Sequence, residues 1–374
     1  MAELKRKVLH QRLADRLRRE IRHDWTPGQR FNTELELADR FDVSVGTVRQ
    51  ALLTLCNEGL LRRRQGAGTF VCGTTDVGRV AILTSSRARE PGRSVFFPRL
   101  AEALQHRLDA ESLACRSVTG ICQEGGSETA TGQSFVADVE TGRISGALGV
   151  GISVRDWLRE LLAENEVPLV GAASRIYRHR VRIDQEEMVR QGVRFLLDRG
   201  RRKLALLHPA DHGPGGPDDD PHLRAFREEL EAAEVEFREE RVFSSINPTA
   251  AGSGWSDFAD LWGNPALRPD ALLVCDDCLY RDAAPMFLAR AIRIPRELLV
   301  ATHANCGTEM IYPFPTARMQ YDPTEFADAM MEMLLELMRG EEPEEEERLI
   351  EFRWRGIDEV DRALREGAEE TVGT

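Results

Sequence analysis

The side chains whose chemistry most clearly indicates a function lie between residues 49 and 64. Arg49 and Gln50 stand near the start of a helical pattern, and three consecutive arginines follow at 62–64. Guanidinium and amide groups form hydrogen bonds with nucleobase edges, and guanidinium groups also neutralise phosphates. We therefore expect this stretch to contact double-stranded DNA. The alternative for Arg49 is an ion pair with Glu36 or Asp39 on the helix surface.

Two short helices and a hairpin must position these groups. Thr33 and Glu36 form a capping box at the start of the first helix, and Ser44 is a suitable N-cap for the second. Strands over 60–64 and 69–72, joined by a glycine-rich tip, complete a winged helix-turn-helix whose second helix enters the major groove. The apolar residues expected to face the core are Leu35, Leu37, Ala38 and Phe41 on the first helix and Val48, Ala51, Leu52 and Leu55 on the second.

Residues 1–72 closely resemble the DNA-binding domain of GntR-family regulators. The shared pattern is a leading helix over 4–22, Pro-Gly at 27–28, a Glu-led helix, Val-Ser-x-x-Thr-Val-Arg at 43–49, Gly-Leu at 59–60 and Gln-Gly-x-Gly-Thr-Phe-Val at 65–71. The pattern and the resemblance together imply DNA contacts at Glu34, Ser44, Val45, Gly46, Thr47, Arg49, Gln50, Arg62, Arg64, Gln65, Gly66 and Gly68.

This chain departs from the family's usual reading residues at two positions. The family usually has arginine at the position of Leu35, and arginine or a similar long polar residue at the position of Val45. Arginine reads guanine O6 and N7, which leucine and valine cannot do. We therefore expect an operator half-site that differs from the common family sequence.

The charge is divided unevenly along the 374 residues, whose net charge is −13. Residues 1–72 hold 14 Lys and Arg against 9 Asp and Glu, while the remainder holds 36 against 54. A basic head on an acidic body concentrates the attraction to phosphate in one place. No apolar run approaches the roughly 20 residues that span a membrane, and we expect neither a signal peptide nor a membrane contact.

The seven cysteines are odd in number and scattered, which favours reduced thiols in a cytoplasmic protein. Cys275 and Cys278 have CxxC spacing without a second pair or histidines, so we expect incidental thiols rather than zinc ligands. The loop 211–222 is rich in Asp, His, Gly and Pro. It allows two interpretations, a ligand-gating or metal-binding loop and a solvated turn-rich loop, and the second is favoured. We expect no metal and no cofactor.

Strand and helix patterns alternate from residue 79 to 356, after a polar linker at 73–78 and before a charged tail at 357–374. Such alternation predicts an α/β fold of parallel sheets with helices on both faces. The expected elements include strands over 80–83, 147–152, 203–207, 271–275, 298–302 and 350–354. Ligands bind such folds beyond the carboxyl ends of the strands. Two lobes of this kind, joined by hinge strands, form a cleft that closes on a small molecule.

The body is similar to the LacI and periplasmic sugar-binding pattern. The shared segments are 181–184 with the helix and strand that follow, 269–277, 294–300 and 313–318. Residues 1–72 and this body together resemble arabinose-repressor-like regulators. The resemblance implies ligand contacts at Phe96, Phe97, Asp184, His222, Arg224, Asp276, Asp277 and His303.

Several of these positions have an alternative structural role. Either of Phe96 and Phe97 would serve equally in the core, and Asp276 would serve equally as a helix cap. His222 and His303 stand where the family has an arginine and an aspartate, which places a standard free pentose or hexose in doubt.

The predicted function is a cytoplasmic, homodimeric transcription regulator, a repressor controlled by a sugar or sugar derivative. One alternative is control by a protein partner or a non-sugar ligand. Another is an enzyme with a DNA-binding head, for which the chain offers no P-loop, Gly-x-Ser-x-Gly or His-Glu-x-x-His motif, and only an incomplete glycine pattern at Gly149 and Gly151.

Overall fold

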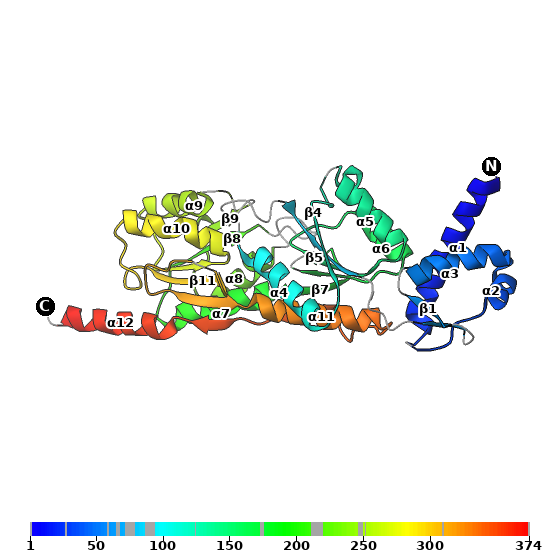
Figure 1. Ribbon diagram of the computed structural model, residues 1–374. Helices are drawn as coiled ribbons and strands as arrows, with labels where there is room; N and C mark the ends of the chain where they lie inside the picture. Colours follow the sequence, from blue (N-terminus) through cyan, green and yellow to red (C-terminus); the bar gives the residue numbers. More distant parts are fainter. Residues whose placement is uncertain are drawn as a thin grey trace. The chain divides into compact units, whose positions relative to one another are not determined.

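The computed structural model describes residues 2–26, 28–57, 60–64, 68–71, 79–86, 94–123, 125–172, 176–210, 220–245, 250, 252–308 and 310–372. The chain separates into two compact units (Figure 1). Unit 1 consists of Met1–Ser85, Leu104–His179 and Met330–Glu344, and unit 2 consists of Ser86–Ala103, Arg180–Ala329 and Glu345–Thr374. The predicted linker at 73–78 lies outside the described residues. The division into a DNA-binding, a linking, a ligand-binding and a tail segment stays a prediction.

The N-terminal part of unit 1 is the expected winged helix-turn-helix. It consists of α1 (Ala2–Asp24), α2 (Glu34–Phe41), α3 (Val45–Asn57), β1 (Leu61–Arg64) and β2 (Gly68–Val71). The Thr33–Glu36 capping box is present, and Ser44 Oγ accepts a hydrogen bond from the Thr47 amide at 3.2 Å, so both predicted caps are confirmed. The core residues are Leu13, Ala14, Leu17, Ile21, Phe31, Leu37, Val48, Ala51, Leu52, Leu55, Leu60, Leu61 and Val71.

Leu35 does not join that core, and the prediction was wrong there. Its side chain is 73% exposed on α2, whereas Leu37 is fully buried. Leu35 and Leu37 are two residues apart on α2, so their side chains point to roughly opposite sides of the helix. Leu35 lies on the outer side, where the related family usually carries a polar side chain.

The wing is an antiparallel pair in which Leu61 faces Val71 and Arg64 faces Gly68. Gly68 has φ +110°, a conformation that L side chains rarely adopt, and a Cβ there would lie 3.0 Å from Arg30 Nε. Glycine at this position therefore lets the strand begin close to the segment before α2. That segment adds a bridge between Arg30 and Phe70 to the edge of the pair.

The first large sheet has the strand order β13-β7-β6-β5-β3-β4. These strands are β3 (Arg79–Thr84), β4 (Cys115–Thr119), β5 (Ile144–Val150), β6 (Leu169–Ala172), β7 (His179–Ile183) and β13 (Glu347–Ile350). The helices associated with it are α4 (Phe96–Ala110), α5 (Ala130–Glu140), α6 (Asp156–Glu164) and α11 (Pro323–Met338). Helices α5 and α6 bury Phe135 and Leu158 against Ala81 and Ala147. On β5, Gly146 approaches Leu334 and Met338 of α11.

Glycines in this sheet leave room for one buried tyrosine. Tyr177 is 2% exposed, and its hydroxyl donates to the Ile152 carbonyl at 2.8 Å. A Cβ on Gly149 would lie 2.3 Å from the Tyr177 hydroxyl oxygen, and a Cβ on Gly171 would lie 2.1 Å from its ring. Gly149 is therefore explained by packing rather than by an approaching phosphate.

We expect Gly171→Ala to lower the free energy of unfolding by about 3 kcal/mol, because the ring of Tyr177 cannot move away without breaking its hydrogen bond. Urea unfolding followed by circular dichroism measures the change. Gly263→Ala is the matched control, since a Cβ there meets nothing within 4 Å. A loss at Gly171 no larger than at Gly263 would contradict this account of the packing.

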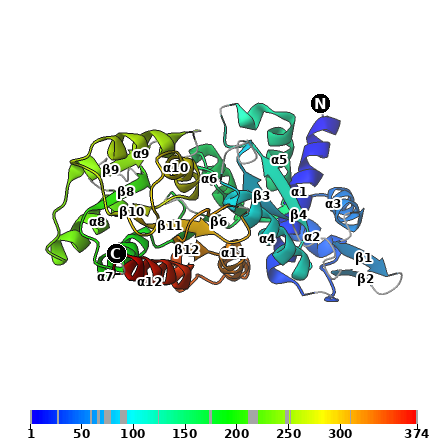
Figure 2. The same ribbon diagram turned by 90° about the vertical axis from the view of Figure 1, so that its left-hand side faces the viewer.

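The second large sheet belongs to unit 2 and has the order β14-β12-β11-β10-β8-β9. Its strands are β8 (Leu204–Pro209), β9 (Val242–Ser245), β10 (Ala271–Val274), β11 (Leu299–Asn305), β12 (Ala317–Tyr321) and β14 (Arg353–Arg355). All neighbouring pairs are parallel except β12 with β14. Helices α7 (Gln185–Asp198) and α8 (Pro221–Ala232) cover one face, and α9 (Ser253–Gly263) and α10 (Asp277–Ala289) cover the other (Figures 1 and 2).

Several elements differ from the expected ones. The single last strand predicted at 350–354 is two strands, β13 and β14, which join different sheets. Helices α5 and α9 and strands β9 and β12 had no counterpart in the prediction. The tail forms α12 (Ile357–Val372), in which Val360 is fully buried and Asp361 forms an ion pair with Arg199 at 2.7 Å. In the described part of the chain, no helix is long and apolar enough to cross a membrane.

Candidate functional site

A charged network occupies the exposed side of the helix-turn-helix. Glu34 at the start of α2 accepts hydrogen bonds from Arg49 of α3 at 2.9 Å and from Arg63 of β1 at 2.7 Å. Arg49 is 58% exposed and Arg63 is 42% exposed. The hydrogen bond from Arg49 lowers the pKa of Glu34, which keeps this carboxylate charged. Glu34 thus aligns two arginines from different elements, and it replaces Glu36 and Asp39 as the partner of Arg49.

The other predicted DNA contacts fall into three groups. Gln50 and Gly46 are exposed on α3, while Val45 is half-buried. Thr47 is only 7% exposed, and its hydroxyl lies 2.9 Å from Ser44 Oγ, so it supports the turn. The side chains of Arg62 and Arg64, and residues Gln65 and Gly66, lie outside what the structure describes. DNA contact by each of these residues and by Gly68 stays a prediction.

A second polar group lies at the carboxyl edge of the second sheet. Because β8, β10 and β11 are parallel neighbours, the residues that end or follow them gather at one edge. His208 is the second-last residue of β8, and Asp220 is the N-cap of α8, where its Oδ1 accepts from the amide of His222 at 2.9 Å. His208, Asp220 and His222 are each at most 3% exposed.

These three side chains are within contact distance of one another. Asp220 Oδ1 lies 3.2 Å from His222 Nδ1, and Asp220 Oδ2 lies 3.5 Å from His208 Nδ1. The two imidazole rings have centroids 5.2 Å apart. His208 Nδ1 also lies 3.1 Å from the Pro209 carbonyl oxygen, which orients the ring.

Asp277 forms the centre of the neighbouring group. It is 2% exposed at the start of α10, and its Oδ2 accepts from Asn305 Nδ2 at 2.8 Å and from Ser94 Oγ at 3.2 Å. Among the described residues, its Oδ1 has no hydrogen-bond partner. An unpaired buried carboxylate oxygen is costly, and a ligand donor would satisfy it.

Asp277 and Ser94 also line a cavity of about 480 Å³, within the usual size range of ligand pockets. Arg281 adds one charge to the lining, and most of the remaining wall is apolar. The other lining residues are Val95, Cys278, Ala284, Pro285, Leu288, Thr308, Met310, Ile311 and Pro313. The cavity therefore combines an apolar surface with a few convergent polar groups.

His303 on β11 interacts electrostatically with Asp277 and with His222. Burial lowers the pKa of its imidazole, the charge of Asp277 opposes this effect, and His222 reinforces it. The ring also packs at 5.2 Å from the ring of Tyr321. A neutral imidazole at this place both donates and accepts hydrogen bonds.

Asp276 caps α10, accepting from the amides of Cys278 at 2.8 Å and Leu279 at 3.0 Å. Burial raises its pKa from 3.8 to about 7, and the neighbouring charge of Asp277 acts in the same direction. Asp276 therefore has the capping role that was one of its two alternatives, while a contact with the ligand stays a prediction.

This pKa predicts a pH-dependent stability. The unfolded chain loses the proton of Asp276 near pH 4 and the folded chain near pH 7, so the free energy of unfolding decreases between these values. Asp276→Asn keeps the capping oxygen and removes the charge. We expect the variant's stability relative to the parent to rise by about 2 kcal/mol from pH 5 to pH 8, measured by urea unfolding. The exposed Asp109→Asn is the control, and parallel pH profiles for the Asp276 variant and the parent would contradict the assignment.

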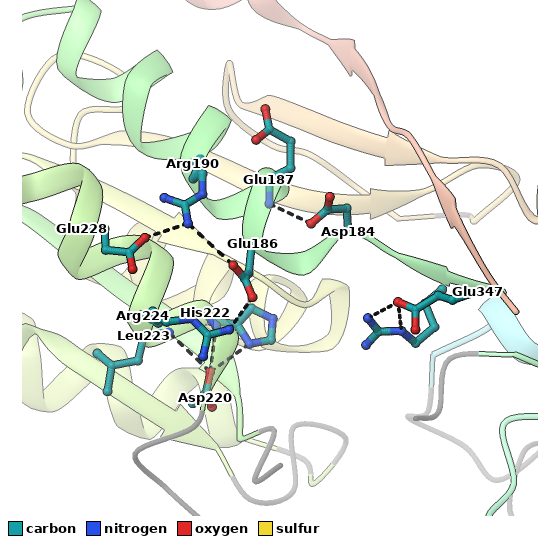
Figure 3. A network of polar contacts seen from close by, with 11 residues as sticks. Asp184, Glu186, Glu187, Arg190, Asp220, His222, Leu223, Arg224, Glu228 and Glu347 are labelled. Carbon is teal, nitrogen blue, oxygen red and sulfur yellow. Dashed lines mark hydrogen bonds and ion pairs between the residues drawn. The ribbon is translucent and has the colours of Figure 1, made fainter. Parts of the chain in front are cut away.

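Two predicted ligand residues have other partners in the structure, and their contact with a ligand stays a prediction. Arg224 is exposed on α8 and forms an ion pair with Glu186 of α7 (Figure 3). Asp184 caps α7 by accepting from the Glu187 amide at 3.0 Å. Asp184 borders a different hollow, lined also by Tyr321 and Phe352.

Phe96 and Phe97 have different environments, as the two alternatives for this pair allowed. Phe96 is 8% exposed and packs edge-on against Phe326 at 5.0 Å, which places it in the core. Phe97 is half-buried, and its ring lies 5.4 Å from that of Phe96. A stacking role for Phe97 stays a prediction.

Four residues of this region were missed by sequence reasoning, namely Ser94, His208, Asp220 and Asn305. Only Asp220 carried a usable local signal, because an acidic residue before a proline is typical of a helix start. Cys275 and Cys278 are buried beside the site, and burial raises the pKa of both thiols, which favours their neutral form.

Comparison with known proteins identifies both parts of the chain. Residues 9–71 match the bacterial regulatory proteins of the gntR family, and residues 193–356 match the periplasmic binding protein-like domain. A stretch of 66 residues is 44% identical to the Escherichia coli mannosyl-D-glycerate transport/metabolism system repressor MngR, covering 17% of this chain and 28% of that protein. A stretch of 64 residues is 41% identical to the Bacillus subtilis HTH-type transcriptional repressor NagR, covering 17% and 26%. The chain thus matches about a quarter of the length of these relatives.

Solved structures show the same architecture. The transcriptional regulator CelR in complex with cellobiose superposes with a TM-score of 0.59 at 18% identity, covering 87% of this chain and 98% of that one. The regulator CcpA of Lactococcus lactis gives 0.59 at 15% identity, covering 74% and 97%. The chain therefore has an N-terminal segment similar to the gntR-family helix-turn-helix, followed by a periplasmic-binding-protein-like domain with predominantly parallel sheets.

Proposed function

We propose that this chain is a sequence-specific DNA-binding transcription regulator, a repressor, whose operator affinity is controlled by a small ligand. The observation that carries the proposal is Asp277, a buried carboxylate with one unpaired oxygen that borders a cavity in a domain of ligand-binding architecture. The exposed arginines aligned by Glu34 supply the DNA contact in the same chain. The proposed role is that of a cytoplasmic binding protein.

The proposed ligand is a sugar or sugar derivative. Asp277 and Ser94 offer a carboxylate acceptor and a hydroxyl group at the cavity, which suit the hydroxyl groups of a sugar, and the apolar wall of the cavity suits the apolar face of a ring. The structural relative in complex with cellobiose supports this class of ligand. The absence of the family's arginine at His222 favours a derivative over a free pentose or hexose.

The proposed assembly is a homodimer that binds two operator half-sites. Helix-turn-helix dimers place their recognition helices one helical turn apart, so a change in dimer geometry changes operator affinity. A ligand acts by favouring one of two dimer states, and its effect equals its difference in affinity for them.

A thermal-shift screen of the full chain tests the ligand. The panel contains free sugars, sugar alcohols, uronic acids and sugar phosphates. A ligand at about 100 times its Kd adds roughly 2.7 kcal/mol to the native state, which raises Tm visibly. A single chemical class of stabilising compounds is the expected result. A flat response across the panel would overturn the sugar assignment and leave control by a non-sugar ligand or a protein partner.

A further inference from the structure

The group formed by His208, Asp220 and His222 has the composition of a metal site. One ligand atom from each residue lies within 4.8 Å of the ligand atoms of the other two. Imidazole nitrogen combined with a carboxylate oxygen suits borderline cations such as Zn²⁺ better than Mg²⁺ or Ca²⁺, which prefer oxygen ligands. The loop that precedes Asp220 is not needed for this set.

The spacing of the Asp220 and His222 ligand atoms fits a tetrahedral ion. Bonds of 2.0–2.1 Å to a tetrahedral Zn²⁺ place adjacent ligand atoms about 3.4 Å apart. Asp220 Oδ1 lies 3.2 Å from Nδ1 of His222, close to that value. His208 offers Nε2 as its ligand atom, because its Nδ1 donates to the Pro209 carbonyl oxygen.

The three side chains are held in place before any ion arrives. Asp220 is fixed by accepting the amides of His222 and Leu223 at the first turn of α8, and the Pro209 carbonyl oxygen orients His208. All three are at least 97% buried, so bulk water does not compete freely for the ion. Rigid, oriented ligands of this kind are a requirement for a precise metal site.

We propose that His208, Asp220 and His222 bind one zinc-class divalent cation, with a water molecule as the fourth ligand. Two neutral imidazoles and one carboxylate leave the bound ion with a net charge of +1. The ion thus supplies, beside Asp277 and His303, the positive charge that the family's arginine would carry at position 222. This inference does not depend on the ligand being a sugar.

The test uses the untagged full chain, stripped with a chelator and titrated with ZnCl2 in a calorimeter and with CoCl2 in a spectrophotometer. One Zn²⁺ per chain is expected, and the Co²⁺ form is expected to show the visible bands of a tetrahedral site. His222→Asn and His208→Asn are expected to raise the Kd for Zn²⁺ at least about 100-fold. The exposed His106→Asn on α4 is the matched control and is expected to bind like the parent.

Asp220→Asn separates coordination from folding, because asparagine retains the capping oxygen of α8 while losing the charged ligand. It is expected to fold normally and to bind Zn²⁺ at least about tenfold more weakly. Failure of the parent to bind one equivalent, or unchanged binding in His222→Asn and Asp220→Asn, would overturn the metal site. DNA binding by the Zn²⁺-loaded chain is measured in parallel, and its absence would count against the proposed regulator rather than against the metal site.

Discussion

Asp277→Asn is expected to abolish the response to ligand while leaving DNA binding intact. Asparagine has the volume of aspartate and still accepts the hydrogen bond from Asn305, so the fold is retained. The substitution replaces the unpaired carboxylate oxygen with an amide donor and removes the negative charge. Losing a buried charged partner costs about 2–5 kcal/mol, so ligand affinity should fall at least about 30-fold.

Isothermal titration with the compound found by thermal shift measures this affinity, and fluorescence anisotropy measures operator binding. Asp358→Asn, at an exposed position of α12 in the same unit, is the matched control. Unchanged ligand affinity in Asp277→Asn would remove this residue from the site. A parallel loss of operator affinity would show a general defect instead.

Arg49→Ala is expected to weaken operator binding by about tenfold and to reduce the salt dependence of binding. Arg49 is exposed on α3 and is held beside Arg63 by their shared partner Glu34. If it contacts a phosphate, the slope of log K against log salt should decrease by about 1; if it reads a base, discrimination at one position should weaken.

Arg40→Ala is the matched control for this variant. Arg40 is 49% exposed in the same domain and forms a two-bonded ion pair with Glu20, but it lies at the end of α2. We expect operator affinity close to that of the parent. Equal losses in the Arg40 and Arg49 variants would show that general charge, rather than the recognition helix, determines binding.

The helix-turn-helix could be predicted from sequence because its signals are local. The Thr33–Glu36 box and the apolar spacing of α3 depend only on neighbours along the chain, and both are confirmed. The prediction for Leu35 failed because this residue is two positions from buried Leu37 and therefore lies on the opposite side of α2. The ion-pair partner of Arg49 depends on how α2 packs against α3. No local sequence pattern determines that packing.

The fold class of the effector domain could be predicted from the sequence, but several of its strands and helices could not. Alternating patterns indicated parallel sheets, and their carboxyl edges brought Asp276, Asp277 and His303 to one region as expected. Residues 347–355 carry a single apolar pattern, and only the three-dimensional structure shows that two different sheets share it.

The inner polar groups were harder to foresee. His208 is the second-last residue of one strand and Asn305 ends another, and each becomes informative only when the sheet order places it beside its partners. Arg224 lies two residues after His222, so on a helix it points to a different face.

The central claim is that a ligand bound in the effector domain changes operator affinity. The direct measurement is a fluorescence anisotropy titration of the full chain into a duplex selected from a random library, with and without the stabilising compound at saturation. A change in Kd of about 5- to 150-fold, abolished in Asp277→Asn, is the predicted result. An operator Kd that stays the same at a ligand concentration that raises Tm would contradict the claim.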